Sequence, residues 1–198
     1  MAGKDYRLDK TPANKQRLAA YKQDDKWIVD FLNRSEVGHI ATRWDKQPFI
    51  TPSTFWFDKE HHEIIFHSNV VGRIRANSER HQEVCFETSN FGRFLPSNIA
   101  LEFSMQYESV IVFGTIRIIE DDDEKRNGLY NLLAKYFPGM KAGEEYRPIT
   151  EKELKRTSVY AIRIESWSGK RNWKDRADQG DQWKALSEDW FGGDSETR

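Results

Sequence analysis

The stretch YESVIVFGTIRII, residues 107 to 119, decides the fold, because it is the longest of several runs whose composition is typical of β-strands. Tyr, Val, Ile, Phe and Thr, which suit a pleated and half-buried surface, make up most of it. A run of this kind predicts a strand. The rest of the sheet must therefore come from similar runs elsewhere in the chain.

Five further runs of this kind lie on either side of it. They are GHIATRW (38–44), FITPSTFWF (49–57), EIIFHSN (63–69), EVCFETS (83–89) and SVYAIRIESW (158–167). The connections DKQ and DKEHH are short and polar, which favours antiparallel hairpins for the first three strands. Pro48 and Pro52 flank or interrupt the second run, so we expect an edge strand or a bulge there.

Helical patterns are fewer. Asp24 or Asp25 can cap a helix, because the apolar residues that follow recur at three- and four-residue spacing. These residues are Trp27, Ile28, Phe31 and Leu32. GRIRANSER (72–80) predicts a short helix and DDEKRNGLYNLLAKYF (122–137) a longer one that ends at a Pro-Gly pair. A capping box that begins at Thr150 predicts one more turn.

Six antiparallel runs with minor helices predict an α+β, mainly β protein built on a small closed or nearly closed barrel. We expect the barrel domain to span residues 24–175. Residues 1–23 are polar and charged without a period that buries a face, which predicts a flexible N-terminal arm. Residues 176–198 predict a C-terminal tail or docking segment.

Composition excludes several classes of function. The 31 basic and 32 acidic residues nearly cancel, so no overall field favours nucleic acid or an anionic membrane. Cys85 is the single cysteine, which rules out an intrachain disulfide and a Cys-rich zinc site and favours a reducing compartment. The N-terminus lacks the apolar run of a signal peptide, and no segment is long enough to span a bilayer. We expect a cytoplasmic protein.

Few residues suggest catalysis by side chains alone. His61 and His62 lie in a predicted hairpin turn and would point apart, and with His67 they are joined by no carboxylate cluster, which argues against a metal site. The chain has no GxSxG motif and no Gly-rich phosphate loop. Cys85 lies within an apolar strand run, which favours an inert thiol over a nucleophile.

HSNVVGRIR, residues 67 to 75, is the strongest candidate for a binding site. A strand ends at His67-Ser68, Gly72 permits a tight turn, and Arg73 and Arg75 open a short helix. Helix N-terminal amides, a hydroxyl group and guanidinium groups together suit a phosphate dianion. The alternative is the charged first turn of an ordinary surface helix.

IESWSGKRNW, residues 164 to 173, places two tryptophans and two cations just past the last predicted strand. The pattern fits neither a solvated tail nor a core strand. One interpretation is an aromatic and cationic cover for a planar ligand. The other is that Trp167 and Trp173 anchor the core or an interface while Lys170 and Arg171 are solvated.

The order of these motifs resembles the pyridoxamine 5'-phosphate oxidase-like, FMN-binding split-barrel family, and within it the nitroimidazole-resistance type. The motifs are a first amphipathic helix, GHIAT, a Pro-containing strand, IIFHSNVVGR, EVCFE, YESVIVFG and IESWSGK, and the resemblance covers about residues 25–173. It implies a six-stranded antiparallel split β-barrel with peripheral helices that forms a homodimer and binds FMN at the dimer interface.

The resemblance also implies roles for individual residues. Ser68 and Arg73 would hold the phosphate of FMN. The family often has a lysine where this chain has Ile74, and Arg75 is the nearest substitute, although on a helix it points to another side than Arg73. Residues expected to line the flavin ring or reach its polar edge are Pro52, Ser53, Thr54, Phe55, Ser109 and Val110. Lys170 and Trp173 would cover the flavin of the partner, because an indole stacks on isoalloxazine and a cation stabilises reduced flavin.

Three functions remain open. The first is an FMN-dependent oxidoreductase acting on an unidentified small molecule and possibly on a nicotinamide nucleotide, in which His67 donates a proton or binds a small acid near the ring. The second is a non-catalytic flavin-binding or flavin-sensing protein. The third is a split barrel that binds haem or another ligand, in which the histidines would matter more than the arginines.

Overall fold

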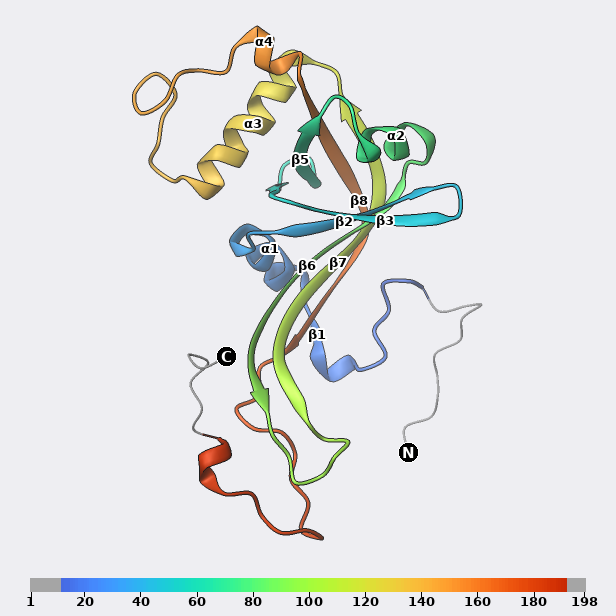
Figure 1. Ribbon diagram of the computed structural model, residues 1–198, viewed down its shortest axis with the longest axis vertical. Helices are drawn as coiled ribbons and strands as arrows, with labels where there is room; N and C mark the ends of the chain where they lie inside the picture. The colour runs from blue at the N-terminus through green and yellow to red at the C-terminus, as the bar shows by residue number, and fades with distance from the viewer. Residues whose placement is uncertain (1–11, 192–198) are drawn as a thin grey trace.

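The computed structural model describes residues 12–191, and antiparallel strands dominate it (Figure 1). The strands are β1 (Lys22–Gln23), β2 (Gly38–Trp44), β3 (Gln47–Ser53), β4 (Trp56–Asp58), β5 (Glu63–Asn69), β6 (Glu83–Leu95), β7 (Ser104–Ile119) and β8 (Thr157–Asn172). The α-helices are α1 (Asp25–Arg34), α2 (Arg73–Arg80), α3 (Asp122–Tyr136) and α4 (Glu151–Leu154), and the 3-10 helices are η1 (Ala19–Tyr21) and η2 (Glu188–Trp190). The α+β, mainly β class is confirmed.

The strands pair in the order β3-β2-β6-β7-β8-β5-β4, and β1 pairs with β8. All of these pairings are antiparallel. The described chain thus has eight strands where six runs were predicted, because the run 49–57 divides into β3 and β4 and because β1 carried no apolar signal. Pro48 and Pro52 lie in β3, which ends the sheet, as expected of an edge strand.

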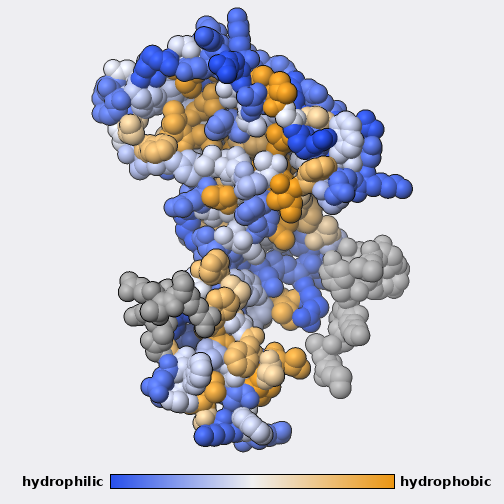
Figure 2. All heavy atoms as spheres, viewed as in Figure 1, coloured by the Kyte–Doolittle hydropathy of each residue, from blue (hydrophilic) through white to orange (hydrophobic). Residues whose placement is uncertain are grey.

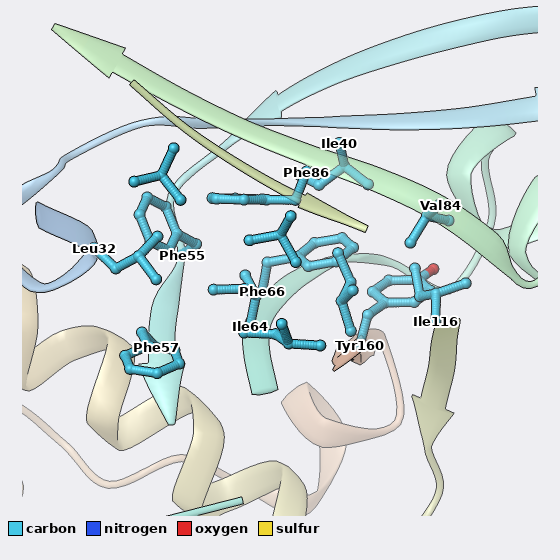
Figure 3. Packing of buried hydrophobic residues seen from close by; sticks show 14 of the residues in the cluster. Leu32, Ile40, Phe55, Phe57, Ile64, Phe66, Val84, Phe86, Ile116 and Tyr160 are labelled. Atoms are coloured by element: carbon cyan, nitrogen blue, oxygen red, sulfur yellow. The ribbon is translucent and has the colours of Figure 1, made fainter. Parts of the chain in front are cut away.

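The core lies between the inner sides of these strands and helix α1, and Figure 3 shows its aromatic centre. Phe66 of β5 stacks on Tyr160 of β8, with ring centroids 4.9 Å apart. Phe55 meets the ring of Phe86 edge to face, at 4.8 Å. Both geometries are those that aromatic pairs prefer, so one pair joins β5 to β8 and the other joins the residue before β4 to β6.

Strand β8 runs longer than the sequence predicted, to Asn172 instead of 167. A bulge lies between the pairs Gly114–Ile164 and Phe113–Ser166, so the extra residue Glu165 reverses which side chains of β8 face inward. That reversal broke the alternation on which the prediction rested. The segment WSGKRNW is therefore mostly strand, and the expectation that it follows the last strand is wrong.

The second half of β8 packs on helix α1. Trp167 contacts the core, and its Nε1 donates a hydrogen bond to Asp25 at 2.8 Å. The predicted cap is present, because a carboxylate oxygen of Asp24 accepts from the backbone N–H of Trp27 at 2.8 Å. Trp167 is thus an anchor of the core, one of the two roles predicted for it.

Both ends of the described chain contact the sheet. Gln16 donates to the carbonyl oxygen of Gly169 at 2.9 Å and β1 pairs with β8, so residues 12–23 are docked, whereas residues 1–11 of the predicted arm lie outside the described residues. Ser97, beyond β6, donates to the carbonyl oxygen of Asp178 at 2.7 Å. The segment after β8 thus runs along the β6–β7 hairpin in an elongated arm (Figure 1). Within residues 12–191, none of the helices has the length and apolar content needed to span a bilayer.

Gly169 sets the distance between β8 and α1, which gives a first prediction. A Cβ atom at this position would lie 2.7 Å from Cγ1 of Ile28 and 3.1 Å from the Trp27 ring. Gly169→Ala should therefore destabilise the protein by about 1–3 kcal/mol, as overpacking does. Urea unfolding measures the loss, and Ile28→Ala, which removes the nearest carbon, should make the alanine at position 169 less costly. An equal cost in both backgrounds would contradict this account of the packing.

Candidate functional site

A cavity of about 470 Å³ lies between the end of β5, helix α3 and the segment that joins α3 to α4. Its wall is mainly apolar, and α3 contributes Leu129, Leu132, Leu133 and Tyr136. Figure 2 shows apolar side chains gathered around a hollow in this part of the molecule. Thr54 and His67, two of the residues predicted to form the site, open onto the cavity.

Helix α3 is held over this cavity from both ends. Asp121 caps its N-terminus by accepting from the backbone N–H of Glu124 at 2.8 Å. Near its C-terminus the hydroxyl oxygen of Tyr136 accepts from the N–H of Phe55 at 2.9 Å, and Lys135 Nζ donates to the carbonyl oxygen of Phe55, also at 2.9 Å. Tyr136 and Lys135 thus fix the helix to the link between β3 and β4.

His67 brings the only imidazole among the residues that line the cavity. Its side chain is partly exposed, but the surrounding protein atoms lower its pKa below the ordinary 6.5 by burial. At neutral pH it is therefore an uncharged ring, which can accept a proton or bind a metal centre. Arg147 and Glu153, also in the wall, pair with each other at 2.7 Å.

A second cavity of about 410 Å³ adjoins the first, since Thr157 lines both. It is polar, and Arg75 lies in its wall, where it donates to the Ser158 hydroxyl at 3.2 Å and pairs with Glu79 at 2.5 Å. Ser68 is the strand partner of Ser158. Ser68 and Arg75 therefore come together here, although Glu79 offsets the charge of Arg75 and raises its pKa.

Arg73 points elsewhere. Its guanidinium lies 5.3 Å from the ring of Trp44 and 5.2 Å from that of Phe49, on the β2–β3 hairpin. Among residues 12–191, no carboxylate lies within ion-pair distance of it. Helix α2 begins right after Gly72, which has no side chain to cap the first turn. A positive charge and uncapped amides thus lie together at this helix end.

Ser109 and Lys170 lie on the outer side of the sheet, where they face each other across β7 and β8. Lys170 Nζ is 4.8 Å from the ring of Tyr107. Trp173 follows β8 on the arm, 40% exposed, with the guanidinium of Arg171 at 5.8 Å. Within one chain, Ser109, Lys170 and Trp173 therefore lie apart from the α3 cavity that Thr54 and His67 line.

Four other residues that were predicted to contact the flavin line neither cavity. The side chains of Phe55 and Val110 are fully buried in the core, and the backbone N–H and carbonyl of Phe55 are already hydrogen bonded to α3. Pro52 and Ser53 lie on the edge strand β3, opposite His39 and Gly38.

Sequence reasoning missed the part that α3 plays in the site. The helix itself was predicted, but leucines along one side of a helix indicate packing equally well whether a neighbouring element or a cavity covers them. The described residues hold no group of three or more His, Cys, Asp or Glu placed to bind a metal ion. Burial raises the pKa of the Cys85 thiol, which disfavours its reactive thiolate form.

The two histidines with shifted pKa values give a second prediction. Titration followed by NMR should place His67 below 6.5 because of burial, and His61 above 6.5 because it is hydrogen bonded to Asp58 at 2.8 Å. His67 should lower stability as the pH falls below 6.5, since the unfolded chain binds that proton more readily. The contribution of His61 should be present below 6.5 and vanish as the pH rises through its folded pKa.

Asp58→Asn is the matched control for this titration. It should return His61 toward 6.5 and leave His67 unchanged. A His67 that titrates at or above 6.5 would contradict the burial of its ring beside the cavity.

Comparison with known proteins identifies the family. The family model described as pyridoxamine 5'-phosphate oxidase matches residues 24–171. The fold is similar to that of the flavocytochrome Anf3 from Azotobacter vinelandii, with 24% identity, a TM-score of 0.75, and 85% of this chain and 76% of that one covered. An FAD and haem binding protein from Mycobacterium smegmatis matches with 24% identity and a TM-score of 0.73, over 82% of this chain and 78% of that one.

A third structure extends the comparison. A 5-nitroimidazole antibiotic resistance protein from Bacteroides thetaiotaomicron matches with 19% identity and a TM-score of 0.63, over 76% of this chain and 90% of that one. A search of curated proteins gave no match. Because the family model covers well over half of its residues, this chain belongs to the pyridoxamine 5'-phosphate oxidase family, which has the split-barrel fold.

Proposed function

We propose that this protein binds a flavin and uses it for two-electron oxidation or reduction of a small molecule. The observation that carries the proposal is the grouping of Thr54 and His67 on one mainly apolar cavity, at the end of the strand from which the chain passes to Arg73. Family membership supports it, as do the names of two structural neighbours, one an FAD and haem binding protein and the other a flavocytochrome.

The phosphate end of the flavin has a suitable partner in this chain. We propose that Arg73 and the uncapped amides at the start of α2 hold the phosphate that FMN carries, with Ser68 nearby as a hydroxyl donor. Arg73 is favoured over Arg75, because Glu79 already neutralises Arg75 whereas Arg73 has no carboxylate partner among the described residues. Arg73 stacks on aromatic rings, and this contact leaves its positive charge available for the phosphate of a ligand.

The apolar cavity suits the substrate side of the ring. A bound flavin supplies the electron chemistry, while the protein orients the substrate and excludes water. His67 is placed to hold a proton at an imidazole nitrogen facing the cavity, where its lowered pKa keeps it uncharged at neutral pH. The apolar side chains of α3 favour a substrate with few charges.

A homodimer belongs to the same proposal. Ile50 and Phe91, both 71% exposed, lie on the outer side of the sheet that also carries Ser109 and Lys170. Because large apolar side chains are stabilised when they leave water, these two favour contact with a second copy of the chain on this side of the sheet. Lys170 and Trp173 would then reach the flavin of the partner, and the Lys170 charge would stabilise the reduced ring.

The third prediction tests the phosphate contact. Arg73→Ala should weaken flavin binding by about ten- to a hundredfold, as expected for loss of a charge-assisted hydrogen bond. Quenching of flavin fluorescence measures the affinity of the flavin-free protein. Arg176→Ala is the matched control, because Arg176 lies on the arm and pairs with Glu188 at 2.6 Å. Equal flavin affinity in wild type and Arg73→Ala would exclude Arg73 from the site.

Haem binding is a second candidate function, favoured by one observation. The α3 cavity combines an apolar wall with a neutral imidazole, the kind of group that ligates a haem iron. Two structural neighbours carry haem or cytochrome in their names. The residues of the cavity therefore fit the group, with His67 as the ligand to iron.

The fourth prediction separates the two candidates. If haem binds, the protein reconstituted with haem should show a Soret band that shifts in His67→Ala and returns when imidazole is added. Arg73→Ala should leave the band unchanged. A Soret band identical in wild type and His67→Ala would exclude His67 as the iron ligand, and a spectrum of flavin alone after haem reconstitution would exclude the candidate.

A further inference from the structure

Two cavities of opposite character meet beside helix α3. The α3 cavity, of about 470 Å³, is mainly apolar, whereas the second cavity, of about 410 Å³, is lined largely by charged and hydroxyl-bearing side chains, and we call it the polar cavity. Thr157, at the start of β8, belongs to both walls, and α4 lies near the N-terminal end of α3 (Figure 1). Because the two spaces meet at Thr157, one ligand can extend into both.

One side of helix α3 runs along both cavities. It begins with a cation, Lys125, in the polar cavity and continues with the apolar side chains of the α3 cavity, Leu129, Leu132, Leu133 and Tyr136. These positions recur every three or four residues, so they share one side of the helix. With a rise of about 1.5 Å per residue, this stripe is about 16 Å long. It is thus charged at its N-terminal end and mainly apolar over the rest.

The wall of the polar cavity carries one positive charge in excess. It holds three cations, Arg75, Lys125 and Lys155, and two carboxylates, Glu79 and Glu120. Both carboxylates pair with Arg75, at 2.5 Å and 3.9 Å. Within residues 12–191, neither lysine pairs with a carboxylate of this cavity, so the charges of the two lysines are available to a ligand.

Lys125 and Lys155 approach the polar cavity from two different helices. Lys125 of α3 has only 14% of its side chain exposed, and its carboxylate partner within the described chain is Asp122, at 3.6 Å and 53% exposed. Lys155 follows α4 and has no carboxylate within ion-pair distance in the described part of the chain. A largely buried ammonium group is stabilised by an anion that lies close to it. The two lysines therefore favour an anionic group between them.

We propose that the two cavities together bind an apolar carboxylic acid. The carboxylate lies between Lys125 and Lys155, and the apolar body extends along the leucines of α3 toward Thr54 and His67. This inference rests on the proposed function, in which the α3 cavity holds the substrate of a bound flavin, and it names the chemical class of that substrate.

A single carboxylate fits the charges of this site better than the alternatives. One excess positive charge balances one negative charge, whereas a phosphate dianion would leave a negative charge over. The single guanidinium of the wall, which would suit phosphate, is already paired with Glu79. A neutral apolar molecule would fill the α3 cavity but leave the charge of Lys125 with only its exposed partner Asp122.

The fifth prediction compares two ligands with the same alkyl chain, octanoate and octan-1-ol. Calorimetric titration of the wild type should show about tenfold tighter binding of octanoate, as expected of one charge-assisted contact. The double variant Lys125→Gln/Lys155→Gln should lose this preference and keep its affinity for octan-1-ol. Lys155→Gln alone, which changes an exposed side chain, should lose part of the preference. Leu133→Gln, in the wall of the α3 cavity, should weaken both ligands.

Lys152→Gln is the matched control, because Lys152 lies on α4 and lines neither cavity. It should bind both ligands as the wild type does. Equal affinities of the wild type for octanoate and octan-1-ol, or equal losses in Lys152→Gln and Lys155→Gln, would overturn the inference and leave flavin binding standing. Octanoate affinity unchanged in the double variant would place the acid elsewhere, for example on the exposed aromatic side chains of the arm, and would also overturn it.

Flavin binding is measured on the same preparations, so the two proposals can fail separately. A lysine-dependent preference for octanoate in a protein that binds no flavin would overturn the proposed function and the role of the acid as a substrate, while the acid site itself would stand.

Discussion

The pairing of β7 with β8 is the constraint on which the rest of this structure depends. The two strands stay in contact from Ile119–Val159 at one end to Tyr107–Asn172 at the other. On its other edge β8 pairs first with β5, which leads to the candidate site, and later with β1. A strand that serves two partners in turn must change direction between them, and the bulge at Glu165 provides the bend. Because the bulge reverses which side chains of β8 face inward, Gly169 faces α1, and its lack of a side chain lets the helix pack closely.

Side-chain hydrogen bonds hold the part of the site that strand pairing does not fix. The link between β3 and β4 has no strand partner of its own at Phe55, so its backbone groups need other partners. Tyr136 and Lys135 supply them from α3. Burial lowers the pKa of Lys135 to about 8, which shows that its ammonium group is held in a poorly hydrated place by carbonyl oxygens. The cavity beside His67 thus keeps its shape through a few directed hydrogen bonds.

Much of the fold could be predicted from the sequence, because local patterns define it. The strands 38–44 and 63–69 and the cap at Asp24 match the predictions, since each lies in a segment whose own residues specify it. The continuation of β8 beyond 167 could not be predicted in this way. It depends on a bulge and on packing against Ile28, and neither leaves a period in the sequence. The site was predictable as far as its segments and the divergence of Arg73 and Arg75, but the groups that each arginine contacts were not.

Helix geometry explains why those two arginines diverge. Residues two apart on a helix point to different sides, so one turn of α2 cannot aim both guanidinium groups at the same ligand. Arg75 meets Ser158 and Glu79 inside the polar cavity, while Arg73 meets the rings of the hairpin. The position between them, Ile74, is 5% exposed and belongs to the core. A lysine there would place its charge among apolar side chains in this arrangement, which agrees with our proposal that Arg73 and the amides of the first turn of α2 are the groups that bind the phosphate.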